Sequence, residues 1–160
     1  MDAIVEYRER MLSRYDEAVD EFCAACRAVK DPHVPLGPGE WSVHQIAVHT
    51  RDTDREVYGL RTRRTLNEED PLFPNFDGEA WMEAHYEPRE ELGTILDGLK
   101  ASVTEQVRLL RGLSPEGWSR PSRHETLGAG FTTQTWVERN LAHIEEHLQT
   151  LKGLPRAIGP

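Results

Sequence analysis

Two histidines spaced four residues apart, His143 and His147, are the residues of this chain whose spacing most clearly suggests chemistry. On an α-helix, positions i and i+4 lie on the same face. The apolar residues of this segment share that face, so both imidazoles are expected to point into the protein. A third histidine, His49, lies on the apolar side of another expected helix. Three inward imidazoles from two helices favour a metal site.

Neutral imidazole is a ligand that zinc and nickel accept readily, and three protein ligands with one open position are typical of a catalytic site. The sequence therefore predicts that His49, His143 and His147 hold a divalent metal ion, either zinc or nickel. The alternative is that each histidine is a core residue with its own hydrogen-bond partner. That alternative requires a separate hydrogen-bond partner for each of the three histidines in the protein interior, because buried polar groups rarely lack partners.

Two further histidines and one glutamate are candidates for proton transfer. His85 and His124 lie in expected irregular segments from which either could reach the site as a proton carrier or as a fourth metal ligand, although a surface position is the simpler expectation. Residues 143–147 also fit the pattern His-x-x-Glu-His, in which Glu146 would be a general base. A peptidase of that type needs a further carboxylate ligand downstream, and residues 148–160 contain no Asp or Glu. The sequence therefore assigns no general base.

Polar residues near the histidines could orient the metal-binding imidazoles through hydrogen bonds. The candidates are Asp52, Asp54, Asn140 and Gln149. For the two aspartates the helix exterior is the simpler expectation. His44 is also expected to face away from the site, and His33 is expected to be solvated in a proline-rich loop.

Cys23 and Cys26 form a Cys-Ala-Ala-Cys sequence. In redox proteins this spacing opens a helix, whose dipole lowers the thiol pKa. Here the pair falls inside an expected helix, on or beside its apolar stripe. We therefore expect both cysteines to be small core residues rather than redox or zinc-binding groups.

Composition and charge exclude several classes of partner. The chain has 160 residues, with 19 Lys and Arg against 28 Asp and Glu, and a net charge of −9. Phosphates repel such an acidic domain, which argues against binding to nucleic acid or anionic membranes. No apolar stretch approaches the roughly 20 residues that span a bilayer, and no segment reads as a signal peptide. We expect one domain over residues 1–160, located in the cytoplasm.

Helical periodicity predicts four long amphipathic helices, and hence an all-α four-helix bundle. The expected ranges are 2–29, 42–66, 88–112 and 133–152. Ser42 is the expected N-cap of the second helix, with Gln45 completing a capping box, and Thr132 or Thr133 is expected to cap the last. A short extra helix is expected at about 77–85, inside the long acidic connection 67–87. Residues 119–131 are expected to be irregular, and no strand pair is predicted.

These motifs together resemble the DinB/YfiT-like superfamily. Three stretches carry the resemblance: residues 40–49 (EWSVHQIAVH), Trp118-Ser119-Arg120-Pro121 followed by residues 124–128 (HETLG), and His143-x-x-x-His147-x-Gln149. The resemblance covers nearly the whole chain. It implies a four-helix bundle with a divalent metal ion held by His49, His143 and His147 at the base of an open cleft.

The resemblance also implies a range of functions. Related proteins include thiol-dependent transferases that use bacillithiol or glutathione-like cofactors, and a mycothiol-dependent maleylpyruvate isomerase; homodimers are common. We therefore expect a homodimeric metal-dependent thiol transferase or hydrolase that acts on a small molecule, with a low-molecular-weight thiol as a candidate cofactor. The alternatives are a non-catalytic bundle that binds metal or a small ligand, and a helical interaction module.

The aromatic residues Phe73, Phe76 and Trp81, in an otherwise acidic connection, are the expected contact surface.

Overall fold

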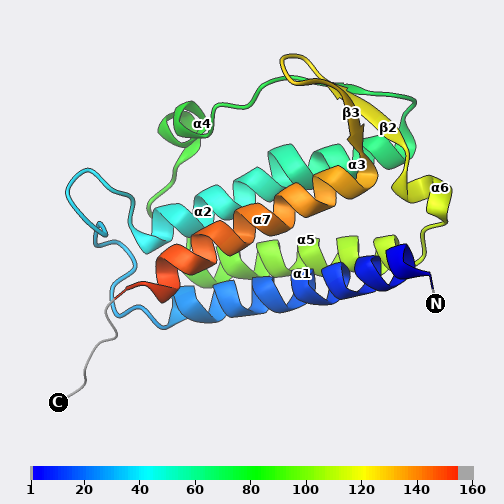
Figure 1. The fold of residues 1–160 in the computed structure, drawn as a ribbon. Coiled ribbons are helices and arrows are strands. Elements are labelled where there is room, and N and C mark those ends of the chain that lie inside the picture. Colours follow the sequence, from blue (N-terminus) through cyan, green and yellow to red (C-terminus); the bar gives the residue numbers. More distant parts are fainter. Residues whose placement is uncertain (1, 155–160) are drawn as a thin grey trace.

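The fold is a bundle of four long helical segments, seen in a computed structural model that describes residues 2–154. The segments are α1 (Ala3–Arg27), the continuous run of α2 (Val43–Thr53), η1 (Asp54–Tyr58) and α3 (Gly59–Asn67), then α5 (Leu92–Arg111) and α7 (Thr133–Lys152). Figure 1 shows them running side by side, with α4 and the strands outside the bundle. The predicted four-helix bundle is confirmed.

The helix ends follow the capping signals of the sequence. The Ser42 side chain accepts a hydrogen bond from the Gln45 backbone N–H while the Gln45 side chain accepts from the Ser42 N–H, as a capping box requires. Thr132 caps α7 in the same way with Thr135. The third long helix differs from expectation, because α5 begins at Leu92 and not at Pro88. Residues 88–90 instead form a turn that precedes the helix.

The apolar stripes of the four segments meet in one core. Its largest fully buried side chains include Tyr15, Phe22, Leu96, Leu99 and Ile144. Cys23 and Cys26 belong to this core as free thiols, and burial raises the pKa of Cys26 to about 12. The expectation that they are core residues is therefore confirmed. Within residues 2–154, no helix combines the length and the apolar character needed to cross a membrane.

A π-helical turn at Asp54–Tyr58 interrupts the second long helix. A turn of this kind contains an extra residue, so the side chains that follow are rotated relative to an α-helix. The 3.6-residue period predicts that Leu60 faces inward, but Leu60 is only half-buried. Arg61 and Thr65 are buried in its place. The interior face of α3 therefore includes Arg61 and Thr65 rather than Leu60.

Asp54, the first residue of the π-turn, lies in the core, contrary to the exterior position expected for it. Its side chain is 1% exposed. The carboxylate accepts hydrogen bonds from Ser102 Oγ at 2.5 Å, Gln106 Nε2 at 2.7 Å and Asn140 Nδ2 at 2.8 Å. Burying a carboxylate costs free energy unless hydrogen bonds compensate, and these donors supply the compensating hydrogen bonds. The network ties η1 to α5 and α7.

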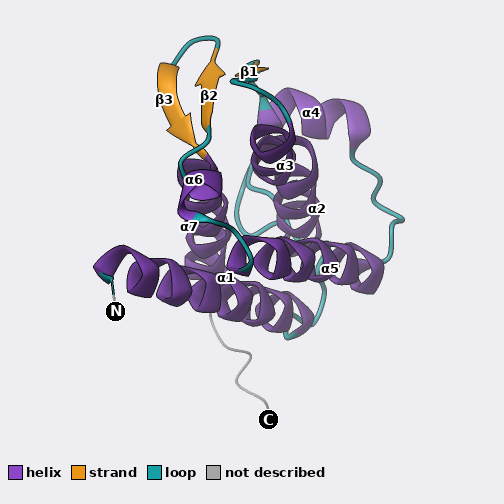
Figure 2. Cartoon of the chain, turned by 90° about the vertical axis from the view of Figure 1, so that its right-hand side faces the viewer, coloured by secondary structure: helices purple, strands orange, loops and turns teal. Residues whose placement is uncertain are grey.

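A three-stranded sheet lies beyond one end of the bundle, where residues 119–131 were expected to be irregular. β2 (Pro121–His124) pairs antiparallel with β3 (Gly128–Thr132), and β1 (Leu72–Phe73) pairs parallel with β2. Strands this short show no alternation of apolar and polar residues in the sequence. In addition, β1 joins the sheet from a distant part of the chain. Figure 2 shows the hairpin standing above α6 and α7, beside α3. Because β3 runs directly into α7, the hairpin is fixed relative to the last helix.

Two short helices complete the fold. The predicted short helix is α4 (Gly78–His85), capped by Asp77. Trp81 Nε1 on α4 donates to Asp52 Oδ2 at 3.0 Å, which holds α4 against α2. The other short helix is α6 (Pro115–Trp118). Phe73 was expected to belong to an exposed contact surface, but it is 1% exposed because its ring packs edge-on against Trp136.

Candidate metal centre

The three predicted ligands, His49 from α2 and His143 and His147 from successive turns of α7, come together in the structure. Nε2 of His143 lies 3.0 Å from Nε2 of His49 and 3.1 Å from Nε2 of His147. One nitrogen from each ring falls within 4.8 Å of the other two. The contact between α2 and α7 thus joins residues from distant parts of the sequence.

This arrangement of nitrogens suits a cation better than it suits hydrogen bonds among the rings. A contact between two imidazole nitrogens holds one proton, and His143 Nε2 would have to serve two such contacts at once. A divalent cation would use all three lone pairs, and imidazole nitrogen is a preferred donor for zinc and nickel. The residues present therefore fit a divalent metal ion.

Burial keeps the three imidazoles in the neutral form that binds metal. Burial, helped by the nearby His147, lowers the pKa of His49 to about 4. Burial and the two neighbouring rings lower the pKa of His143 to about 3. Burial also lowers the pKa of His147, and Glu146 acts weakly in the opposite direction. No proton has to leave these rings at neutral pH before a metal ion can bind.

A cavity of about 290 Å³ opens beside the cluster, and His49 and His143 line it. The residues that contribute polar groups to its wall include Thr53, Tyr58, Arg61, His124 and Arg139. Sequence reasoning missed Tyr58, Arg61 and Arg139. A charged side chain on a helix is expected at the surface, so the sequence gave no sign that either arginine reaches the cavity.

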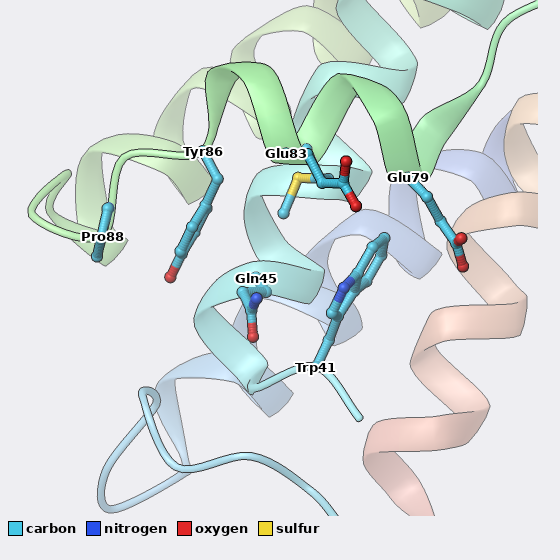
Figure 3. A pocket seen from close by; sticks show the side chains of 7 residues that line it. Trp41, Gln45, Glu79, Glu83, Tyr86 and Pro88 are labelled. Carbon is cyan, nitrogen blue, oxygen red and sulfur yellow. The ribbon is translucent and has the colours of Figure 1, made fainter. Parts of the chain in front are cut away.

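A second cavity, of about 370 Å³, lies on the side of His147. Trp41 and Glu79 line it together with His147, and the Trp41 ring lies 4.8 Å from the ring of His49. Trp41 and Glu79 also line an adjoining cavity of about 440 Å³, shown in Figure 3 between Trp41 and Tyr86. No histidine among the described residues lines that third cavity. The two cavities that touch the cluster are therefore the better candidates for chemistry.

The sequence model of the DinB superfamily matches residues 8–151. The chain belongs to the DinB superfamily. This confirms the family that the motifs suggested, and the match includes all three histidines of the cluster.

Among solved structures, this DinB-superfamily chain is similar to YfiT from Bacillus subtilis. The TM-score is 0.74 at 22% sequence identity, and the match covers 97% of this chain and 91% of YfiT. YfiT is described as a probable metal-dependent hydrolase with an unusual four-helix bundle topology. At this identity the likeness shows that the two chains share a fold. A comparison with curated protein sequences gives no significant match.

In this member of the DinB superfamily, none of the polar residues expected to orient the imidazoles bonds to them. Asp54 and Asn140 bond to each other in the buried network, and Gln149 is exposed. Asp52 is buried and not exterior as expected, and its carboxylate accepts from Arg51 Nε and Trp81 Nε1. Asp52 still affects His49, because its charge acts to raise the pKa of that imidazole against burial.

His124, expected at the surface, is 5% exposed and lines the same cavity as His49 and His143. Its Nδ1 accepts hydrogen bonds from the backbone N–H groups of Thr126 and Leu127, both at 3.2 Å. In the neutral ring the proton is therefore on Nε2. Burial, with the charge of Arg61, lowers the pKa of His124 and favours that neutral form. His124 is thus suited to donate a hydrogen bond rather than to bind metal as a fourth ligand.

The remaining candidates lie away from the cluster. His44, expected to face elsewhere, is fully buried: its Nε2 donates to the Glu90 carbonyl, and its Nδ1 lies 2.7 Å from the Tyr86 hydroxyl. His85 is exposed and stacks on Trp81. Glu146 is exposed as well. Neither His85 nor Glu146 lines the two cavities, so the structure does not support them as proton carriers.

Proposed function

We propose that this chain is a metal-dependent hydrolase whose centre is formed by His49, His143 and His147. The observation that carries the proposal is the convergence of three neutral imidazoles, two of which line the 290 Å³ cavity and the third the 370 Å³ cavity. A divalent ion held by three nitrogens with an open position supplies a Lewis acid that activates water as a nucleophile at neutral pH. The likeness to YfiT, described as a probable metal-dependent hydrolase, supports hydrolysis as the reaction class.

The protein's own groups would bind and orient the substrate in the 290 Å³ cavity. In hydrolysis the oxygen of water bonds to an acyl carbon or a phosphorus, the bond to the leaving group breaks, and the two protons of water end on the products. His124 Nε2–H and the Tyr58 hydroxyl line the cavity and can donate hydrogen bonds to the substrate's oxygens. Val57, Phe76 and Leu127 supply the apolar part of the cavity wall.

The test is metal-dependent turnover by the purified full chain. The protein is stripped with a chelator, reconstituted with zinc or nickel, and assayed with p-nitrophenyl carboxylate and phosphate esters. Turnover should require the metal, should disappear in the double variant His143→Ala/His147→Ala, and should persist in His85→Ala, which removes an exposed histidine outside the centre. Turnover that survives in the double variant would rule out the proposal.

A second candidate is a thiol transferase that uses the same centre. The observation that favours it is the presence of two cavities at the cluster, one lined by His49 and His143 and the other by His147. Two cavities offer room for two substrates, as transfer requires. In such a reaction the thiolate sulfur bonds to an electrophilic carbon, the leaving group departs, and the thiol proton passes to solvent. Consumption of glutathione with 1-chloro-2,4-dinitrobenzene, dependent on added metal, would select this candidate over hydrolysis.

A further inference from the structure

Arg61 is a buried cation for which the described residues provide no anion. Its side chain reaches the cavity beside the histidines, yet the residue is only 7% exposed. Among residues 2–154, the Pro74 carbonyl, at 2.8 Å from an Arg61 terminal nitrogen, is the acceptor that its guanidinium contacts. A guanidinium has five N–H donors, so most of its hydrogen-bonding capacity remains available.

Arg51 provides the comparison within the same chain. It is also 7% exposed, but it pairs with two carboxylates, those of Asp52 and Glu90. Burying a charge is costly unless an opposite charge and hydrogen bonds accompany it. Within residues 2–154, Arg51 has partner carboxylates and Arg61 has none. A ligand anion would complete the second site as Asp52 and Glu90 complete the first.

The surroundings of Arg61 in the cavity are also positive. Arg139 lines the same cavity from α7 and acts on Arg61 as a like charge, and no carboxylate is among the described residues that form the cavity wall. His124 adds a donor, its Nε2–H, to the same wall. Glu125, the nearest acid in sequence to His124, has its carboxylate engaged by the Asn75 backbone N–H at 2.6 Å. Two guanidinium groups are the arrangement that best holds a planar or tetrahedral oxyanion.

We propose that Arg61 and Arg139 bind the carboxylate or phosphate group of an anionic small-molecule substrate in the cavity beside His49 and His143. The two arginines fix the anionic end, and the reacting bond is thereby directed towards the histidines that share the cavity. The statement that the anion belongs to a substrate rests on the proposed function. The anion site itself depends only on the cavity and its charges.

A purely structural role for Arg61 makes a different prediction. The guanidinium lies over the rings of Trp136 at 4.9 Å and Phe73 at 5.7 Å, so it also helps to pack β1 against α7. Arg139 has no such role in the core, since it is exposed and lies over Phe131 at 5.1 Å. If Arg61 only packs, replacing Arg139 should not change the affinity for anions. Arg139 is therefore the residue that separates the two accounts.

The experiment is an NMR titration of the full chain after metal removal, so that no anion can bind through a metal ion. Inorganic phosphate and succinate are added separately at constant ionic strength, and the arginine Nε–H signals are followed. The variants are Arg61→Gln and Arg139→Gln, with Arg55→Gln as the matched control, since Arg55 is exposed and lies outside the cavity. Thermal melts check that each variant is folded.

The proposal predicts saturable shifts with at least one anion, and the preferred anion identifies the group as phosphate or carboxylate. Affinity should fall about tenfold or more in Arg61→Gln and Arg139→Gln, and by less than about twofold in Arg55→Gln. Absence of saturation with both anions, or wild-type affinity in Arg139→Gln, overturns it. Should Arg61→Gln fail to fold, Arg139→Gln decides. Because the titration uses metal-free protein, its failure is distinct from failure of the metal-dependent activity.

Discussion

Individual imidazoles of the cluster link the site to the stability of the whole chain. In the folded protein burial lowers the pKa of His49 to about 4 and that of His143 to about 3, from an ordinary value of 6.5. The unfolded chain exposes the same rings to water, where their pKa returns to the ordinary value. Folding therefore opposes protonation of the cluster, and the free energy of unfolding must depend on pH.

For the metal-free protein, we predict that the free energy of unfolding falls as the pH is lowered from 6.5 to about 4. In this window the unfolded chain binds a proton at His49 and the folded chain does not, so added protons favour unfolding. Urea unfolding midpoints, measured in the presence of a chelator across this window, give the slope. The free energy of unfolding should fall less steeply with pH in the variant His49→Gln than in the wild type. In His33→Gln, at an exposed position, it should fall as steeply as in the wild type. Equal slopes for His49→Gln and wild type would refute the assignment.

At the scale of secondary-structure elements, local signals predicted most of the fold. Ser42 and Gln45 marked the start of α2, and the spacing of His143 and His147 placed both rings on the inner face of α7. These features depend on residues within one or two turns, which a single sequence displays directly. The same reasoning placed His49 correctly, because it precedes the π-turn.

What the sequence did not reveal depends on contacts between distant segments. Asp54 and Arg61 are charged, so the sequence alone places them at the surface, and their interior positions depend on hydrogen-bond partners from other segments. His44 is buried because the segment before α5 covers it, with Tyr86 and Glu90 as partners more than 40 residues away. His124 lies in the cavity wall because of strand pairing, and the sequence of residues 121–132 does not predict this pairing. Interior polar positions of this kind require the tertiary structure.

Two glycines provide a matched prediction for the π-turn. A Cβ at Gly59 would lie 2.6 Å from the Asp54 carbonyl oxygen and 2.8 Å from Asp54 Oδ1, so Gly59→Ala should destabilise the protein by about 1–3 kcal/mol. A Cβ at Gly98 in α5 would approach its nearest neighbour, the Arg51 side chain, only to 3.9 Å, and Gly98→Ala should stabilise by up to about 1 kcal/mol through helix propensity. Urea unfolding measures both. Stabilisation by both substitutions would mean that the π-turn does not constrain Gly59.

For the molecule as a whole, the core and the candidate centre are largely separate. α1 and α5 form much of the buried core and contribute no ligand to the cluster, while α2 and α7 contribute both core and ligands. The bundle therefore has its own hydrophobic stabilisation without a metal ion. This is the arrangement expected when metal serves chemistry, whereas small domains built around a structural metal unfold without it. The homodimer that the resemblance implied stays a prediction, for which sedimentation velocity is the test.

Removal of metal should accordingly leave the protein folded. We predict that a chelator leaves the far-UV circular dichroism spectrum of the full chain unchanged and lowers its melting temperature only by the lost binding energy. At a free metal concentration 100 times the dissociation constant, that energy is about 2.7 kcal/mol. Readdition of zinc or nickel should restore the melting temperature. Loss of helical signal on chelation would instead indicate a structural metal site and would favour a non-catalytic role.

The claim on which the account depends is that His49, His143 and His147 bind a divalent metal ion together, and counting bound metal tests it most directly. Purified full chain is reconstituted with zinc or nickel, freed of excess ion, and measured by elemental mass spectrometry. About one ion per chain is predicted for the wild type and for His85→Ala, and essentially none for His143→Ala/His147→Ala. A wild-type chain without metal, or a double variant that retains a full equivalent, would contradict the account.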